Sequence, residues 1–227
     1  MLDQTGKAVL RIDEVTLKGT RYISPIEAEM REILSVYGEI PLPPYIENNE
    51  IDQKRYQTVY AQNENSVAAP TAGLHITKEI IDRCSGVGAS VVTVNLNVGI
   101  GTFQPISTDS IDEHVMHSER YSVEDDVWET IQKAKRVIAV GTTVVRTLES
   151  VASSGRLEGR TELYIKPGFQ FKVVNSLLTN FHLPKSSLLV MIEAFMGKDW
   201  KSLYDLALKE GYRFLSFGDA MFIERDR

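Results

Sequence analysis

The feature that most constrains this fold is an apolar strand that runs directly into a helix. Residues 136–140 (RVIAV) are typical of a short buried β-strand. The spacing that follows predicts a helix that begins at Thr142 or Thr143 and stops at Gly155. Strand-like and helix-like segments go on alternating after about residue 53. This alternation predicts an α/β fold, with a mixed sheet that carries helices on its faces.

The other elements of this alternating part follow from the same patterns. Further strands are expected over 90–94, 162–165, 214–217 and 220–223. Helices are expected over 77–84, from Ser122 through Ile131, over 187–196, and over 200–210 with Asp199 as the cap. The single cysteine, Cys84, lies in the first of these helices and is expected to be a buried structural thiol.

The start of the chain has a different pattern. Two strand-like runs over 8–12 and 15–17 precede a helix that is expected to begin at Ser24 and to close at Gly38. Residues 40–45 (IPLPPY) then impose an extended, stiff segment, which is the best candidate for a domain boundary. We therefore expect one domain over 1–52 and an α/β domain with most of the active site over 53–227.

Composition excludes several classes of protein. The net charge of −6 excludes a strongly basic nucleic-acid coat, although a local basic patch remains compatible with it. One cysteine excludes an internal disulfide framework. The chain has neither the roughly 18 consecutive apolar residues of a membrane span nor the apolar stretch of a signal peptide. We expect a cytoplasmic protein without a membrane partner.

Two familiar nucleotide-binding motifs are incomplete here. Residues 99–104 (GIGTFQ) begin like a dinucleotide-binding fingerprint, but Gln104 occupies the place of the third glycine and a proline follows it. Lys185 and Ser186 resemble the end of a phosphate-binding loop, but Pro184 replaces the glycine before the lysine. The sequence therefore weighs against both types of nucleotide site.

Histidines and one helix start are better candidates for chemistry. His75, His114, His117 and His182 all lie in segments rich in turn-forming residues, and imidazole exchanges protons near neutral pH. The helix start at Gly141–Thr143 offers N–H groups to an anion, and its threonine hydroxyls can cap the helix or contact a ligand. His114 and His117 alone are too few for a zinc site, yet a metal-dependent hydrolase built on them remains an alternative.

Nine segments between Tyr37 and Ile223 carry a family resemblance. They are residues 38–46 (GEIPLPPYI), 55–61 (RYQTVYA), 66–75 (SVAAPTAGLH), 98–105 (VGIGTFQP), 116–119 (MHSE), 140–149 (VGTTVVRTLE), 164–169 (YIKPGF), 178–186 (LTNFHLPKS) and 214–221 (FLSFGDAM). Together they resemble the S-adenosylmethionine:tRNA ribosyltransferase-isomerases of queuosine biosynthesis. The resemblance implies an α/β domain with part of a small β-barrel domain at the N-terminus of this chain.

The resemblance also implies a reaction and its partners. Such enzymes transfer and isomerise the ribosyl moiety of S-adenosylmethionine onto 7-aminomethyl-7-deazaguanine at the tRNA wobble position, which gives epoxyqueuosine and releases adenine and methionine. It implies no metal and no cofactor beyond S-adenosylmethionine as a substrate. The expected partners are S-adenosylmethionine and the anticodon loop of a tRNA.

Site residues follow from the same segments. The expected catalytic residues are His75, His117 and His182, with Glu119 as orienter or base. The expected substrate-binding residues are Arg55, Tyr56, Thr58, Pro70, Thr71, Gly73, Gly99, Gly101, Thr102, Gly141, Thr142, Thr143, Arg146, Thr179 and Asn180. Among them, Gly141–Thr143 are expected to hold the methionine carboxylate, and Arg146 that group or a tRNA phosphate. Arg55, Tyr56 and Tyr60 are expected to receive an unstacked anticodon nucleotide.

Two departures from the family pattern bear on activity. Family members normally carry a longer N-terminal part, and strands missing from this chain are expected to be supplied by a second copy in a homodimer. Asn97 stands where the family usually has histidine, and an amide does not titrate. A truncated, non-catalytic homologue that binds S-adenosylmethionine or tRNA is therefore the alternative to an active enzyme.

Overall fold

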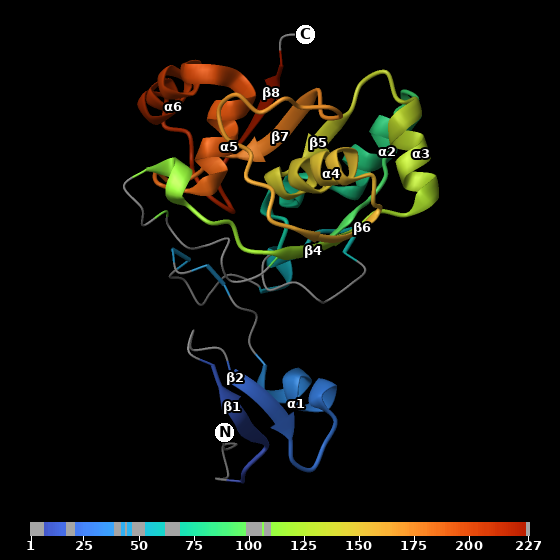
Figure 1. The fold of residues 1–227 in the computed structure, drawn as a ribbon, viewed down its shortest axis with the longest axis vertical. Helices are drawn as coiled ribbons and strands as arrows, with labels where there is room; N and C mark the ends of the chain where they lie inside the picture. Colours follow the sequence, from blue (N-terminus) through green and yellow to red (C-terminus); the bar gives the residue numbers. More distant parts are fainter. Residues whose placement is uncertain are drawn as a thin grey trace. The chain divides into compact units, whose positions relative to one another are not determined.

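The computed structural model describes residues 7–16, 21–38, 42–43, 45–46, 53–61, 69–98, 106 and 110–225 (Figure 1). The chain divides into two compact units, Met1–Pro41 and Leu42–Arg227. This division lies within the proline-rich segment that the sequence marked as a boundary. The assignment of residues 1–52 to a partial barrel domain stays a prediction.

The first unit contains a two-stranded sheet and one helix. Strand β1 (Leu10–Val15) pairs antiparallel with β2 (Arg21–Pro25), and α1 (Met30–Tyr37) buries Ile33. The predicted helix start at Ser24 is wrong, because Ser24 lies in β2 opposite Arg11 and its hydroxyl donates to the carboxylate of Asp13. A residue that is engaged in a strand ladder cannot also serve as a helix N-cap.

The second unit contains two three-stranded sheets. Strands β3 (Asn95–Asn97), β4 (Glu119–Ser122) and β6 (Glu158–Thr161) form an antiparallel sheet in that order. In the other sheet, β5 (Ile138–Val140) is parallel to β7 (Ser176–Asn180), and β8 (Ala220–Glu224) is antiparallel to β7. The prediction of a mixed α/β fold is confirmed.

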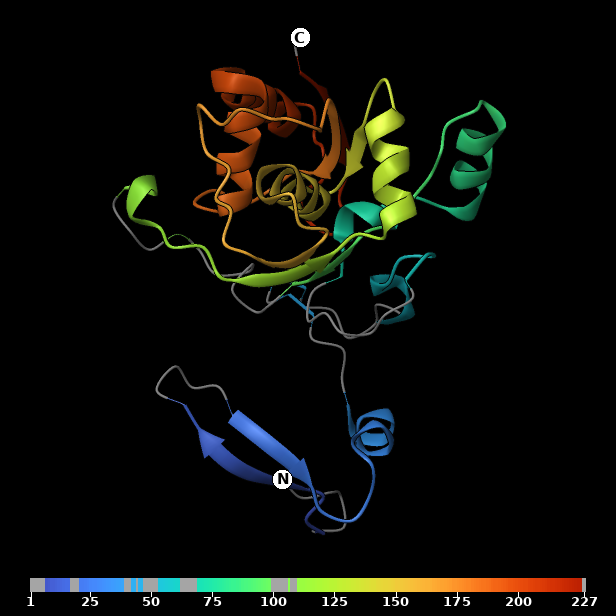
Figure 2. The ribbon, with the colours of Figure 1, turned by 45° about the vertical axis from the view of Figure 1, so that its right-hand side comes forward.

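Helices cover these sheets and close the core. They are α2 (Lys78–Gly86), α3 (Asp125–Lys133), α4 (Thr142–Ser154), α5 (Ser187–Met196) and α6 (Trp200–Lys209). Helix α4 contacts strands of both sheets, and Figures 1 and 2 show it lying between them. The main core joins buried residues of α4, α5 and α6 to β5, β7 and β8, among them Val145, Ile192, Ala207, Ala139, Leu177 and Ile223.

Several predicted elements are confirmed and others are wrong. Helices α4 and α5 begin and end as predicted, with Gly155 closing α4 in the left-handed conformation. Residues 90–94, 162–165 and 214–217 do not form strands. Val91 and Val92 are exposed, whereas Ile165 is buried by packing without a strand partner. Leu215 has a φ of 72°, which bends the chain where a strand was expected.

Smaller differences concern caps and the cysteine. Ser122 ends β4, and α3 begins only at Asp125 after Glu124. Asp199 precedes α6 but makes no side-chain capping bond. Cys84 lies in α2 as predicted, but it is half-buried and not buried. Within the described ranges, no helix is long and apolar enough to cross a membrane.

Candidate functional site

The carboxyl ends of β5 and β7 bring two predicted site segments together. Val140 pairs with Leu178, and the Gly141 N–H donates to the Leu178 carbonyl at 2.8 Å. Because the two strands are parallel, the start of α4 after β5 lies beside the end of β7, where Thr179 and Asn180 stand. Edges of this kind are where open α/β sheets bind ligands.

Gly141 makes this edge possible through its backbone. Its φ of 96° lies in a region that residues with a side chain rarely adopt. Gly141 itself occupies the N-cap position of α4, so the expectation that a threonine hydroxyl caps this helix is wrong. The hydroxyl of Thr147 donates instead to the Thr143 carbonyl one turn earlier, at 3.0 Å.

A cavity lies beside the starts of α4 and α5. Its empty volume is about 550 Å³, part of which is open to solvent. It is lined by His114, Met116, His117, Glu119, Thr142, Thr143, Arg146, Leu163, Tyr164, Ile165, Ser187, Leu188 and Met191. Five of the predicted site residues are in this lining, and the first turns of two helices contribute to it. N–H groups in a first helical turn have no partner within the helix, so these turns favour an anion.

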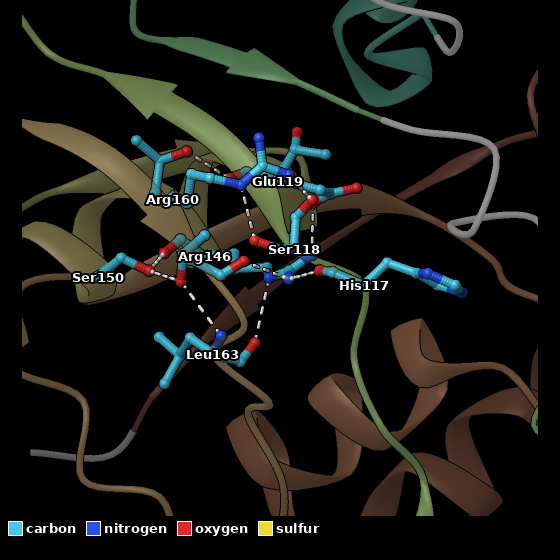
Figure 3. A network of polar contacts seen from close by, with 10 residues as sticks. His117, Ser118, Glu119, Arg146, Ser150, Arg160 and Leu163 are labelled. Atoms are coloured by element: carbon cyan, nitrogen blue, oxygen red, sulfur yellow. Dashed lines mark hydrogen bonds and ion pairs between the residues drawn. The ribbon is translucent and has the colours of Figure 1, made fainter.

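A buried ion pair holds one wall of this cavity (Figure 3). The Arg146 guanidinium pairs with the Glu119 carboxylate, and both side chains are less than 10% exposed, at 7% and 3%. Arg146 Nε also donates to the Leu163 carbonyl at 3.1 Å, and Nη2 donates to the carbonyls of His117 at 2.9 Å and Thr161 at 3.2 Å. Burial lowers the pKa of Arg146, and the charge of Glu119 opposes this shift.

In this network, Arg146 and Glu119 are both engaged by protein groups. The guanidinium is engaged by protein acceptors on two strands and two loops, which favours a positioning role over the predicted contact with a substrate anion. Glu119 is likewise occupied by Arg146. Figure 3 shows the His117 imidazole directed away from the network while its backbone carbonyl is held by it. The ion pair thus fixes the backbone that carries His117.

A second polar cluster lies around Asn180 at the end of β7. Asn180 is 3% exposed, and its amide oxygen accepts a hydrogen bond from His75 Nε2 at 2.8 Å. Its amide nitrogen donates to Thr71 Oγ1 at 3.0 Å. Since a carbonyl oxygen only accepts, Nε2 carries the proton, and Nδ1 of a neutral His75 ring is available as a proton acceptor.

A one-turn helix carries Thr71 and His75 of this second cluster. The 3-10 helix η2 spans Thr71–His75 and follows Pro70. At Gly73 a Cβ atom would lie 2.0 Å from the Tyr60 hydroxyl and 2.9 Å from the Thr58 methyl, so only glycine fits there. The predicted residues of the segment 66–75 therefore act by shaping the backbone as well as by offering polar groups.

His182 has an unusual environment for a catalytic histidine. Its Nε2 lies 3.1 Å from Thr179 Oγ1, and its backbone N–H donates to the Tyr204 hydroxyl at 3.1 Å. Burial lowers the pKa of His182 to about 4. The ring is therefore neutral at pH 7, which disfavours His182 as a proton donor there.

Of the three residues predicted to receive a nucleotide, Tyr56 is packed inside the unit, Tyr60 is half-buried and Arg55 is exposed. Tyr56 is 2% exposed, and its ring meets Phe217 in an edge-on contact with centroids 6.0 Å apart. The Arg55 guanidinium carbon lies 5.8 Å from the same Phe217 ring. Burial raises the pKa of Tyr56 to about 12, and Thr58 is also buried. Stacking of a nucleotide on Tyr56 does not fit this structure, because neither ring face is open.

Other predicted residues are outside the site or outside the described ranges. Gly99, Gly101 and Thr102 lie outside the described residues. Asn97 is exposed on β3 opposite Arg120. In the part of the chain that is described, no group of three or more His, Cys, Asp or Glu side chains is placed to hold a metal ion. His114 packs edge-on against Tyr164 at 5.5 Å between ring centroids.

Sequence reasoning missed the part of the lining that α5 and the segment 163–165 contribute. The start of α5 was predicted. Helix α5 follows β7, the strand that pairs with β5, and this order along the chain is the signal that places its start next to the start of α4. Ser186 caps α5 by accepting from the Leu189 N–H at 3.2 Å, and Lys185 before it has a φ of 58°. Tyr164 lies in one of the nine segments that carry the family resemblance, but no role was predicted for it.

Comparisons with known proteins identify the family. A sequence model described as "Queuosine biosynthesis protein" matches residues 3–223. The chain is 49% identical over 221 residues to a protein of Natranaerobius thermophilus named S-adenosylmethionine:tRNA ribosyltransferase-isomerase. The match covers 93% of this chain and 64% of the relative. A protein of the same name from Desulfitobacterium hafniense is 51% identical over 201 residues, with 85% and 59% coverage.

A solved structure is similar as well. The crystal structure of S-adenosylmethionine tRNA ribosyltransferase from Thermotoga maritima matches with a TM-score of 0.56 and 40% identity, over 67% of this chain and 51% of that one. The chain spans about three fifths of the length of the first curated relatives, at 64% and 59%. From the match over residues 3–223 and these identities, the chain belongs to the queuosine biosynthesis protein family.

Proposed function

We propose that this chain transfers and isomerises the ribosyl moiety of S-adenosylmethionine onto 7-aminomethyl-7-deazaguanine at the tRNA wobble position. The products are epoxyqueuosine in the tRNA, adenine and methionine. The observation that carries this proposal is the identity of about half of the aligned residues with relatives named for this reaction. A cavity lined by five of the predicted site residues supports it.

The reaction needs groups that move protons. Positive charge on the sulfonium acidifies the neighbouring carbon, whose proton must be removed, and adenine leaves more readily when it is protonated. We assign these transfers to His117, which lines the cavity, and to His75, whose Nδ1 is available while Asn180 holds Nε2. Glu119 acts through its pairing with Arg146, and His182 acts as a neutral hydrogen-bonding partner of Thr179.

The proposed reaction also gives each substrate a place at the site. S-adenosylmethionine enters the cavity beside the starts of α4 and α5, and the anticodon loop of the tRNA presents the modified base at its rim. No cofactor beyond S-adenosylmethionine is part of the proposal. Cytoplasmic location and a homodimer stay predictions, and light scattering of the purified chain tests the second.

Adenine release tests the proposed function. The chain is incubated with S-adenosylmethionine and tRNA that carries 7-aminomethyl-7-deazaguanine at the wobble position, and free adenine is followed by chromatography. We expect release that depends on this tRNA, and a loss of at least about 100-fold in His117→Gln, because general acid–base groups contribute that much. No release from a folded chain that still binds S-adenosylmethionine would contradict catalysis and favour the binding-only alternative.

A further inference from the structure

Tyr164 lines the cavity, and its buried hydroxyl has no hydrogen-bond partner among the described residues. Across the described ranges, four buried side-chain polar atoms have no hydrogen-bond partner: Tyr56 Oη, Thr58 Oγ1, Tyr164 Oη and Trp200 Nε1. Tyr164 is the member of this set that lines the cavity. A buried hydroxyl without a partner costs free energy, so an unpaired one at a ligand site needs an explanation.

The surroundings of Tyr164 hold its ring in place. Its ring meets the His114 ring edge-on at 5.5 Å. Before it in the chain, the Leu163 carbonyl accepts from Arg146, and after it Ile165 is only 1% exposed. The backbone on both sides of Tyr164 is therefore held by hydrogen bonding and packing, and the His114 ring packs against the half-buried Tyr164 ring.

The chemistry of this hydroxyl is that of a donor. Burial and the nearby charge of Asp112 raise the pKa of Tyr164, so the phenol stays protonated at neutral pH. The first turns of α4 and α5 add N–H donors to the same cavity, from Thr142, Thr143 and Ser187. The buried anion in this wall, Glu119, is paired with Arg146.

We propose that Tyr164 is a substrate-binding residue whose hydroxyl donates a hydrogen bond to the carboxylate of the amino-acid portion of S-adenosylmethionine. The inference rests on the proposed function, since it takes that molecule as the ligand. A carboxylate is the anionic group of this ligand at neutral pH, and it accepts several hydrogen bonds at once. Tyr164 would thus complete a donor set that the two helix starts begin.

A thermodynamic cycle tests this contact. The affinities of wild type and Tyr164→Phe are measured by calorimetry for S-adenosylmethionine and for its decarboxylated analogue, without tRNA. We expect Tyr164→Phe to bind S-adenosylmethionine about tenfold more weakly or worse, as for a lost hydrogen bond to a charged group. We expect the same substitution to leave the affinity for the decarboxylated analogue unchanged, because the acceptor is then absent.

Stability separates this role from a structural one. The Tyr164 hydroxyl has no partner to lose among the described residues, so the melting temperature of Tyr164→Phe should be unchanged or higher. Tyr121→Phe is the matched control, because the Tyr121 hydroxyl is bonded to Ser154 Oγ at 3.1 Å and the Arg156 carbonyl at 3.2 Å and is not in the cavity lining. Tyr121→Phe should melt lower and bind S-adenosylmethionine as wild type does.

The possible outcomes distinguish this inference from the proposed function. Unchanged affinity of Tyr164→Phe for S-adenosylmethionine, or an equal loss for both ligands, would overturn the carboxylate contact and leave the proposed function standing. Normal binding in the wild type, a selective loss in Tyr164→Phe and no adenine release would support the contact and contradict the activity. A wild-type chain that binds no S-adenosylmethionine would overturn both.

Discussion

The two halves of α4 bury opposite charges and stabilise them in different ways. In the first half, Arg146 pairs with Glu119 and donates to three backbone carbonyls in the cavity wall. In the second half, Glu149 is fully buried and accepts from the backbone N–H groups of residues 172, 173 and 174 at 2.8, 3.0 and 2.9 Å. One charge therefore holds the cavity, and the other holds the segment that leads into β7.

This comparison shows that a buried charge beside a cavity is not by itself a ligand group. Arg146 and Glu149 are both occupied by protein partners, although only Arg146 lies at the cavity. Among the buried side-chain polar atoms of the described residues, the one in the cavity lining without a hydrogen-bond partner is the uncharged hydroxyl of Tyr164. Binding potential at this site is thus indicated by unused donors and not by formal charge.

The largest expected effect is on stability and comes from removing the ion pair in the first half of α4. Arg146→Met leaves the Glu119 carboxylate buried without its partner, so we expect a loss of about 3–5 kcal/mol in the free energy of unfolding, measured with urea. The double variant Glu119→Leu/Arg146→Met should recover part of that loss, because no charge is then stranded. A double variant as unstable as the sum of the single variants would show that the pair is not coupled.

The next prediction concerns an acid titration of His182, which follows β7 and belongs to neither half of α4. The pKa of His182 is about 4 in the folded chain and near 6.5 in an unfolded one, so the unfolded state takes up the proton first as the pH falls. Stability from this group is complete above pH 6.5 and declines toward pH 4, by about 2.5 kcal/mol between pH 7.5 and 4.5.

His182→Asn is the control for this titration, since asparagine does not titrate. Urea unfolding at both pH values should show a smaller loss in His182→Asn than in wild type. Equal losses in the two proteins would mean that His182 does not carry the depressed pKa.

A change in the second half of α4 separates stability from binding. Glu149→Gln places an amide N–H against backbone donors, and we expect it to cost about 2 kcal/mol of unfolding free energy. Its affinity for S-adenosylmethionine, measured by calorimetry on the folded variant, should equal that of wild type. Weaker binding would mean that the two halves of α4 are not independent.

The smallest expected effect concerns the link between the halves. Ser150 Oγ lies 2.6 Å from the Arg146 carbonyl, to which it donates, and 2.6 Å from Thr161 Oγ1. Ser150→Ala should cost about 1 kcal/mol in urea unfolding, as for one net hydrogen bond. A cost as large as that of Arg146→Met would show that Ser150, and not the ion pair, holds the wall.

The sequence predicted what local patterns determine. Gly141 and Gly155 mark both ends of α4, and the parallel strand before it places Thr142 and Thr143 at the site. The partners of Arg146 were not predictable, because Glu119 and the carbonyls reach it through tertiary packing. Residues 162–165 have the apolar content of a strand, but Ile165 is buried by packing beside the cavity and not by pairing. Whether the Tyr164 hydroxyl finds a partner likewise depends on contacts that no local pattern encodes.

A crystal structure of the chain with S-adenosylmethionine tests the central claim most directly. The claim is that the cavity beside the starts of α4 and α5 is the binding site for this substrate. We expect the ligand in that cavity, with its carboxylate within hydrogen-bonding distance of Tyr164 Oη and the first turn of α4. A ligand bound elsewhere on the chain, or one whose carboxylate contacts the Arg146 guanidinium in place of Glu119, would contradict the account.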